Sequence, residues 1–137
     1  MKEHVLGIDV GATGIKGAII DVNTGKLVTE RVKFDTPHPA TPEAMSGPVK
    51  SIVKELDWDG LIGCGFPAIV KNGKSMTASN IDIAWIGTSI EKVFKKATGL
   101  DVVAINDADA AGLAEAYFGA GKDVDGAVLL ITIGTGI

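Results

Sequence analysis

The sequence predicts an α/β fold: a mixed sheet that starts with three antiparallel strands and carries helices on both faces. Two observations predict it. Three short apolar segments follow one another before residue 35 with only turn signals between them, which is typical of an antiparallel meander. After residue 40, helix-like and strand-like segments alternate, which is typical of parallel strands joined by crossover helices. At 137 residues and 46% hydrophobic, the chain is long enough to bury a core of this kind.

The meander occupies the first quarter of the chain. His4–Val10 is predicted to be a buried strand, and the glycine-rich turn 11–14 leads from it into a second strand, Ile15–Val22. The sequence Asn23-Thr24-Gly25 is a turn signal, and Leu27–Phe34 alternates between apolar and polar residues as a third strand. Because both connections are short, each strand is expected to lie antiparallel to the one before it.

The first helix is predicted after a proline-rich loop. Thr41 can cap it, and Pro42 suits its first position. Apolar residues then recur with the period of a helix; they are Met45, Val49, Ile52, Val53 and Leu56. Gly47-Pro48 interrupts this stripe, so the helix either begins after Gly47 or kinks there. A short apolar strand, Leu61–Phe66, follows.

A second helix, a further strand and a third helix come next. Thr88 with Glu91 forms a capping-box pattern, and Gly99 ends the helix that this pattern opens. Val102–Ile105 is an apolar strand, and Asp107–Phe118 is an alanine-rich helix whose small residues suit close packing. The order β-β-β-α-β-α-β-α is that of a ribonuclease-H-like half-domain, as found in the actin-like ATPase and kinase folds.

One more apolar segment, Ala127–Ile133, does not fit this count of elements. We expect it to open a second domain. The predicted division is therefore an N-terminal ribonuclease-H-like domain at residues 1–125, followed at residues 126–137 by the first strand and loop of a truncated second domain.

Composition excludes several classes of function. The formal net charge is −4 and no basic stripe is present, so nucleic acid is not expected as a partner. The one cysteine, Cys64, lies in an apolar run and allows neither an internal disulfide nor a cysteine zinc cluster. The chain has no signal peptide and no apolar run of about 20 residues, so no membrane partner is expected and the cytoplasm is the expected location.

The loop after the first strand suits a phosphate group. Its glycines let backbone N–H groups approach a ligand, its threonine offers a hydroxyl, and its lysine can reach a phosphate as a point charge. The candidate phosphate-binding residues here are Asp9, Gly11, Ala12, Thr13, Gly14 and Lys16. Asp9 could also hold a hydrated Mg²⁺, which takes only one or two carboxylates. The alternative is a plain glycine-rich hairpin turn with Asp9 as a local cap.

Asn106-Asp107 stands at the end of one predicted strand and the start of a helix. Ligands of open α/β sheets collect at the carboxyl ends of the strands. Asp107 could accept the proton of an acceptor hydroxyl, and Asn106 could hydrogen-bond neighbouring hydroxyls. The alternative is that these residues only cap the helix. Asp109 is the competing carboxylate, and its place deeper in the first turn favours a role in stabilising the helix N-terminus.

Two other segments are candidates for ligand contact. Gly134, Thr135 and Gly136 form a second Gly-Thr-Gly turn after a predicted strand, which could hold phosphate by its backbone amides or be an ordinary turn. Gly65, Ser79 and Asn80 could contact a sugar, with Trp85 as an apolar wall against the sugar ring. The alternative is a hairpin loop with Trp85 as a core anchor.

These motifs give the chain a family resemblance. The segments Gly7–Ala18, Gly65-Phe66-Pro67, Asn80–Thr88, Asn106–Gly112 and Leu129–Ile137 resemble those of the ROK sugar kinases, and among them the polyphosphate/ATP glucokinases. The resemblance covers nearly the whole chain, and the run Asn-Asp-Ala-Asp-Ala-Ala-Gly is its most specific part.

The resemblance implies a two-domain, actin-like enzyme that transfers a phosphoryl group from polyphosphate or ATP to the 6-hydroxyl of glucose. It implies that Asp107 is the catalytic base, that Asn106 binds the sugar, and that the two Gly-Thr-containing loops hold the donor phosphate. Homo-oligomers are usual in the family. Ala12 departs from the pattern, since the family usually has glycine there. Because the residues that complete the sugar site are expected in the second domain, the 137-residue chain alone is expected to be inactive.

Other functions stay open on the sequence. One is a ROK kinase for another hexose or an N-acylhexosamine, whose different sugar contacts would come from the second domain. Another is a non-catalytic sugar-binding or regulatory ROK protein. Regulators of the family carry a helix-turn-helix before the first strand, whereas here the first strand is predicted to begin at about His4, which disfavours a regulator. A third is an actin-like ATPase. Asn106-Asp107 argues against it, because this pair favours a hydroxyl group as the phosphoryl acceptor.

Overall fold

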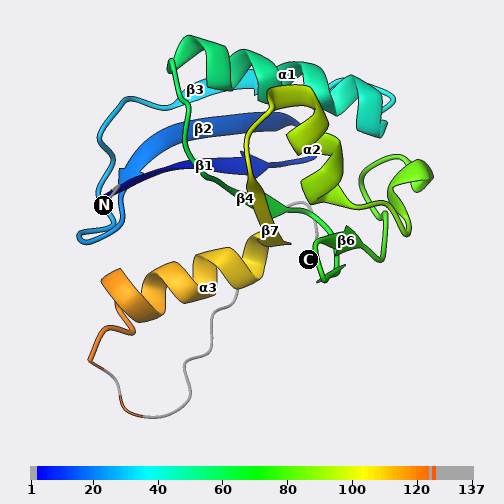
Figure 1. Ribbon diagram of the computed structural model, residues 1–137. Helices are drawn as coiled ribbons and strands as arrows, with labels where there is room; N and C mark the ends of the chain where they lie inside the picture. The colour runs from blue at the N-terminus through cyan, green and yellow to red at the C-terminus, as the bar shows by residue number, and fades with distance from the viewer. Residues whose placement is uncertain (1–2, 124, 126–137) are drawn as a thin grey trace.

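The computed structural model describes residues 3–123 and 125. Its centre is a five-stranded sheet with the strand order β3-β2-β1-β4-β7 (Figure 1). β1 pairs antiparallel with β2, which pairs antiparallel with β3, whereas β4 runs parallel to β1 and β7 parallel to β4. The strands are β1 (His4–Val10), β2 (Gly14–Asp21), β3 (Val32–Asp35), β4 (Ile62–Phe66) and β7 (Val102–Asn106). The predicted mixed sheet with an antiparallel start is confirmed.

The third strand is shorter than predicted. Leu27 makes only an isolated bridge to Ile20, and regular pairing with β2 begins at Val32. Between these points the Thr29 hydroxyl accepts a hydrogen bond from the backbone N–H of Ile19 at 3.0 Å. A side chain therefore occupies a position that a strand backbone would fill, and the ladder is interrupted.

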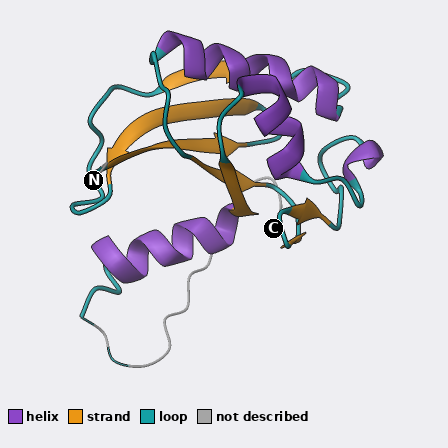
Figure 2. Ribbon diagram, in the orientation of Figure 1, coloured by secondary structure: helices purple, strands orange, loops and turns teal. Residues whose placement is uncertain are grey.

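The helices cover the two faces of the sheet unequally. α1 (Pro42–Glu55) and α2 (Ile90–Thr98) lie side by side on one face, and α3 (Asp107–Phe118) lies on the other (Figures 1 and 2). α1 starts at Pro42 and passes through Pro48, so the helix does not begin after Gly47. Thr41 caps it as predicted, since its hydroxyl accepts a hydrogen bond from Ala44 N at 3.2 Å.

The cap of α2 lies one residue later than predicted. Ser89 is the N-cap, and its hydroxyl accepts a hydrogen bond from Lys92 N at 3.2 Å. The Thr88 hydroxyl instead donates to the carbonyl of Ala84 at 2.7 Å, which fixes the preceding turn. The predicted capping box is therefore wrong, because the Glu91 carboxylate accepts a hydrogen bond from the backbone N–H of Ala104 in β7 at 3.1 Å. Gly99 ends the helix in the left-handed conformation, as predicted.

Between β4 and α2 the chain forms small elements that the sequence did not predict. They are the two-stranded hairpin of β5 (Val70–Lys71) and β6 (Lys74–Ser75), and the 3₁₀ helix η1 (Ile83–Trp85). Such short elements leave too few residues for a period of 2 or 3.6 to show. The predicted strand Ala127–Ile133 and the turn 134–136 lie outside the described residues.

The core fills the space between the sheet and α1 with α2. Trp85 is fully buried there, its ring centroid 4.8 Å from that of Phe66 and 5.8 Å from that of Phe94. Its indole N–H donates to the carbonyl of Ala40 at 3.0 Å. Trp85 is therefore a core anchor, and the alternative of a sugar wall is wrong.

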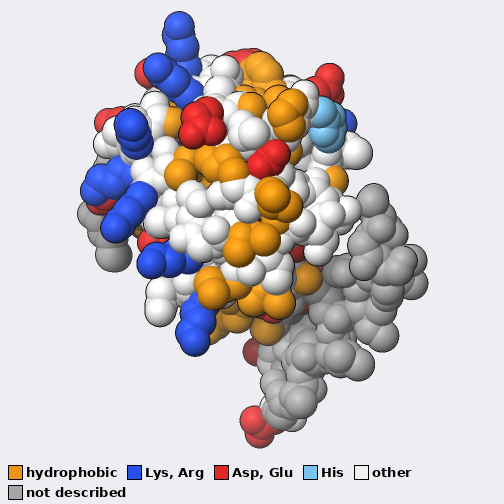
Figure 3. Space-filling view, turned by 90° about the vertical axis from the view of Figure 1, so that its right-hand side faces the viewer, with side chains coloured by type: hydrophobic (Ala, Val, Ile, Leu, Met, Phe, Trp, Pro, Cys, Tyr) orange, Lys and Arg blue, Asp and Glu red, His pale blue; other side chains and the backbone are white. Residues whose placement is uncertain are grey.

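The outer surface is mixed in character. Figure 3 shows Lys and Arg side chains along one border of the face turned to the viewer and hydrophobic side chains scattered over its centre. The α2 lysines contribute exposed charge, and Lys95 pairs with Asp101 at 2.8 Å. Within residues 3–123 and 125, no helix is long and apolar enough to cross a membrane.

Candidate functional site

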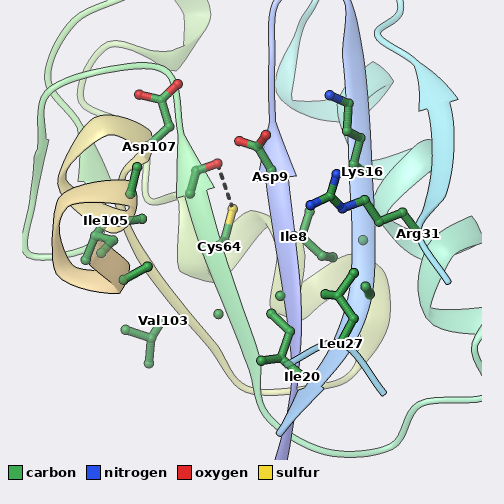
Figure 4. A pocket seen from close by; sticks show the side chains of 18 residues that line it. Ile8, Asp9, Lys16, Ile20, Leu27, Arg31, Cys64, Val103, Ile105 and Asp107 are labelled. Atoms are coloured by element: carbon green, nitrogen blue, oxygen red, sulfur yellow. Dashed lines mark hydrogen bonds between the residues drawn. The ribbon is translucent and has the colours of Figure 1, made fainter. Parts of the chain in front are cut away.

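A hollow of about 630 Å³ lies between the face of the sheet that carries α3 and one side of α3 itself (Figure 4). Small residues from three neighbouring strands line it, and α3 adds alanines one and two turns from its start. These small residues are Gly7, Gly17, Ala18, Gly63, Gly65, Ala110, Ala111 and Ala114. Charged side chains line the hollow as well: Asp9, Lys16, Arg31 and Asp107.

Asp9 lies near the end of β1, opposite Lys16 in β2 and beside Gly65 in β4. Its side chain is exposed to the open hollow, yet protein surrounds it closely enough for partial burial to raise its pKa above 3.8. The negative charge of Asp107 raises this pKa further, and the charges of Lys16 and Arg31 oppose the rise. The three other charged side chains of the hollow therefore all act on Asp9.

Asp107 is the first residue of α3 and is partly buried. One carboxylate oxygen accepts a hydrogen bond from Ala108 N at 2.8 Å. A Cβ on Gly65 would lie 3.5 Å from the Asp107 Cα, so the bare backbone of β4 lets the start of α3 sit close to it. Figure 4 shows the carboxylates of Asp9 and Asp107 at the same end of the hollow.

Asn106 is the cap of α3. Its side-chain oxygen accepts a hydrogen bond from Asp109 N at 3.0 Å, and its side-chain nitrogen donates to the carbonyl of Ala68 at 2.7 Å. The capping role thus belongs to Asn106, while Asp107 keeps one carboxylate oxygen without a described partner. One amide hydrogen of Asn106 also remains for a ligand.

The glycine-rich turn follows Asp9 directly. It is closed by a hydrogen bond of 2.9 Å from Gly11 N to the carbonyl of Gly14, and Thr36 anchors it by donating its hydroxyl to the Gly11 carbonyl at 2.6 Å. Among the described residues, the backbone N–H groups of Ala12 and Thr13 have no acceptor. Free N–H groups at a turn of this kind can bind an anion.

The remaining predicted residues lie elsewhere. Ser79 and Asn80 are exposed on the loop between β6 and η1 and do not line the hollow. Gly134, Thr135 and Gly136 lie outside the described residues.

Arg31 is the charged residue of the hollow that the sequence analysis missed. Arg31 falls in the segment Leu27–Phe34, which was predicted as a regular third strand from its apolar positions alone. The alternation of Arg31 and Lys33 with Val32 and Phe34 was the signal that could have placed both cations on the face of Lys16.

The carboxylate oxygens in the hollow suit Mg²⁺ better than a metal ion whose ligands all come from protein side chains. In the part of the chain that the structure describes, no three His, Cys, Asp or Glu side chains are grouped to hold a metal ion. Asp9 and Asp107 both present carboxylate oxygens to the same hollow. Mg²⁺ takes one or two carboxylates and completes its shell with water and phosphate oxygens, so these residues fit it.

The model of the ROK family matches residues 5–137. The chain belongs to the ROK family. It is 46% identical over 137 residues to a polyphosphate glucokinase of Mycobacterium tuberculosis, and the match spans 99% of this chain and 52% of that protein.

Solved structures of ROK proteins share the fold. An inorganic polyphosphate/ATP-glucomannokinase from Arthrobacter sp. strain KM matches with a TM-score of 0.87 and 43% identity, over 91% of this chain and 52% of that one. A ROK family glucokinase from Streptomyces griseus, in complex with glucose and AMPPNP, matches with a TM-score of 0.77 and 30% identity, over 88% and 38%. The chain thus spans about half the length of the polyphosphate glucokinase and the glucomannokinase, and 38% of the Streptomyces griseus glucokinase.

Proposed function

We propose that the complete gene product is a sugar kinase that transfers the terminal phosphoryl group of inorganic polyphosphate or ATP to the 6-hydroxyl of glucose. The names of the ROK relatives support this class of reaction, since they are a polyphosphate glucokinase, a polyphosphate/ATP-glucomannokinase and a glucokinase. The observation that carries the proposal is the pair of carboxylates, Asp9 and Asp107, at one end of the hollow.

Asp107 is the proposed general base. Its place at the carboxyl end of β7 is where ligands of open α/β sheets collect, and one of its oxygens has no described partner. Asp107 would accept the proton of the sugar 6-hydroxyl as the sugar oxygen attacks the terminal phosphorus of the donor. The terminal phosphoanhydride bond then breaks, and ADP or the shortened polyphosphate leaves. Asn106 has one amide hydrogen left with which to orient the sugar. Gly65, Ser79 and Asn80 are further proposed sugar contacts.

The phosphoryl donor is proposed to bind at the same end of the hollow as the sugar, next to the glycine-rich turn that follows Asp9. The N–H groups of Ala12 and Thr13 would bind oxygens of the donor phosphate, with Lys16 as a point charge. Gly134, Thr135 and Gly136 are further proposed phosphate-binding residues. Asp9 would hold a hydrated Mg²⁺, which when bound neutralises charge on the phosphate oxygens. Positioning and charge stabilisation then supply most of the catalysis. We further propose a cytoplasmic homo-oligomer.

The test is the substitution Asp107→Asn in the complete gene product, with Asp109→Asn as the matched control two residues away. Asparagine keeps the size of the side chain and cannot act as a base, so kcat with glucose should fall by roughly 10²–10⁴ while the KM for glucose changes little. Near-normal turnover of Asp107→Asn, or an equal loss in Asp109→Asn, would contradict the assignment. Running the assay with ATP and with polyphosphate separately identifies the donor.

A further inference from the structure

We call three cationic residues the cationic strip: Lys16 in β2, Lys33 in β3, and Arg31, which directly precedes β3. Lys16 and Lys33 are direct partners in the antiparallel pair, so their side chains stand on the same face of the sheet. Arg31 precedes Val32 and lines the same hollow as Lys16. Figure 4 shows the Arg31 and Lys16 side chains on the β2 side of Asp9.

No side chain of the cationic strip is held in a salt bridge or a hydrogen bond to another described residue, although the charge of Asp9 attracts Lys16 and Arg31 across the hollow. Asp35 lies on the same face two residues after Lys33 and forms no salt bridge with it. Like charges placed directly opposite each other destabilise an antiparallel pair, so Lys16 and Lys33 gain from a bound anion.

The cationic strip adjoins the glycine-rich turn. The Cε of Lys33 lies 2.7 Å, and its Nζ 3.6 Å, from the point where a Cβ of Gly14 would stand. The Lys33 ammonium group therefore lies beside the turn that carries the free N–H groups of Ala12 and Thr13. Lys16 and Arg31 both act on Asp9, whose pKa they lower by their charge.

We propose that Arg31 and Lys33 extend the donor site, so that the cationic strip holds successive phosphate groups of an inorganic polyphosphate chain whose terminal group lies at the glycine-rich turn. This inference rests on the proposed function, and it means that the cationic strip favours inorganic polyphosphate over ATP as the phosphoryl donor. Arg31 offers a fork of N–H donors that matches phosphate oxygens, and the two lysines add point charges.

The surroundings favour a polyphosphate over a nucleotide at this strip. A polyphosphate chain carries negative charge along its whole length, whereas the charge of a nucleoside triphosphate ends after its phosphates and an aromatic base follows. Among the described residues that line the hollow none is aromatic, so a base would find no ring to stack on there. Cations that continue from β2 to β3 suit a charge that repeats.

The test is the double variant Arg31→Gln/Lys33→Gln in the complete gene product. The matched control is Lys50→Gln/Lys54→Gln, which removes two exposed lysines from α1 on the opposite face of the sheet. We expect kcat/KM for polyphosphate to fall by about 10-fold or more, mainly through KM, and kcat/KM for ATP to change by less than about 3-fold. The control should change neither value by more than about 3-fold. An unchanged value for polyphosphate, or equal losses with both donors, would overturn the inference.

A binding experiment separates this inference from the proposed function. Calorimetry with inorganic tripolyphosphate should show binding to the wild-type protein that weakens by about 10-fold in the double variant and survives in Arg31→Lys/Lys33→Arg, which keeps both charges. If the wild type phosphorylates no glucose with either donor, the proposed function fails and this comparison still decides the role of the strip. Equal tripolyphosphate binding by wild type and double variant would refute it. Because the double variant relieves a like-charge pair, its Tm should not fall.

Discussion

The surroundings of Asp9 disfavour the ionised form of its carboxyl group and raise its pKa. Partial burial between β2 and β4 disfavours the ionised carboxylate, and the neighbouring charge of Asp107 disfavours it again. Lys16 and Arg31 offset part of this cost without removing it, since the pKa remains raised. A cost of this kind is common where a site is built to bind a cation or a charged substrate rather than to stabilise the fold.

Removing the charge of Asp9 should therefore stabilise the protein in a pH-dependent way. Below pH 3.8 the carboxyl group is protonated in both the native and the unfolded state and costs nothing. As the pH rises through the raised pKa of the native state, the unfolded chain ionises more easily and native stability is lost. We expect Asp9→Asn to raise Tm at pH 7, with the gain vanishing below about pH 3.8.

Thermal unfolding followed by circular dichroism between pH 3 and pH 8 measures this gain. Asp35→Asn, which removes an exposed carboxylate on β3, is the control and should shift stability by no more than about 0.5 kcal/mol. A Tm of Asp9→Asn that equals or falls below that of the wild type at pH 7 would show that the charge of Asp9 is not disfavoured.

At the scale of residues, the sequence predicted that Asp9, Lys16 and Asp107 would lie near one another better than it predicted which hydrogen bonds the candidate residues make. Thr41 could be read directly as a cap because threonine before proline at a helix start has few other uses. Asn106 and Asp107 could not be separated, since both residue types cap helices well. Only the hydrogen bonds to Asp109 N and the Ala68 carbonyl assign the cap to Asn106.

At the scale of elements, three strand ends and one helix start build the site. β1, β4 and β7 run parallel, so the residues at their carboxyl ends meet at one edge of the sheet. This convergence could be predicted from the order of elements. The length of β3 could not, because the Thr29 hydroxyl replaces a backbone partner and the alternation of apolar residues does not reveal that. The missed positions of Arg31 and Lys33 follow from the same uncertainty.

The cap of α2 gives a prediction for a single element. Ser89→Ala removes the acceptor for Lys92 N and should lower the free energy of unfolding by about 0.5–2 kcal/mol, whereas Ser89→Asp should restore most of the loss. Ser79→Ala is the matched control, because Ser79 is exposed and has no hydrogen bond within the described chain. Urea unfolding measures all three variants. A loss in Ser79→Ala as large as that in Ser89→Ala would rule out the cap as the cause.

At the scale of the whole molecule, the two faces of the sheet are packed differently. The face under α1 and α2 holds the core, and Gly17 lets Ile52 of α1 approach the sheet closely. Among the described elements, α3 alone lies on the opposite face, and none of its residues is fully buried. Helices on both faces could be predicted from the order of elements. The hollow could not, because an alanine-rich helix suits close packing equally well.

This asymmetry predicts that the molecule does not open as one unit. Within the described part of the chain no residue of α3 is fully buried, so little buried apolar area opposes the release of α3 from the sheet, whereas the fully buried Ile90 and Phe94 hold α2 to the core. Native-state hydrogen exchange should therefore show backbone amides of α3 exchanging at least about 10-fold faster than those of α2 and β4, with little dependence on low concentrations of denaturant. Protection of α3 equal to that of α2 would contradict the prediction. Addition of tripolyphosphate should leave the order unchanged, because the cationic strip belongs to β2, β3 and the residue before β3, and none of its residues is part of α3.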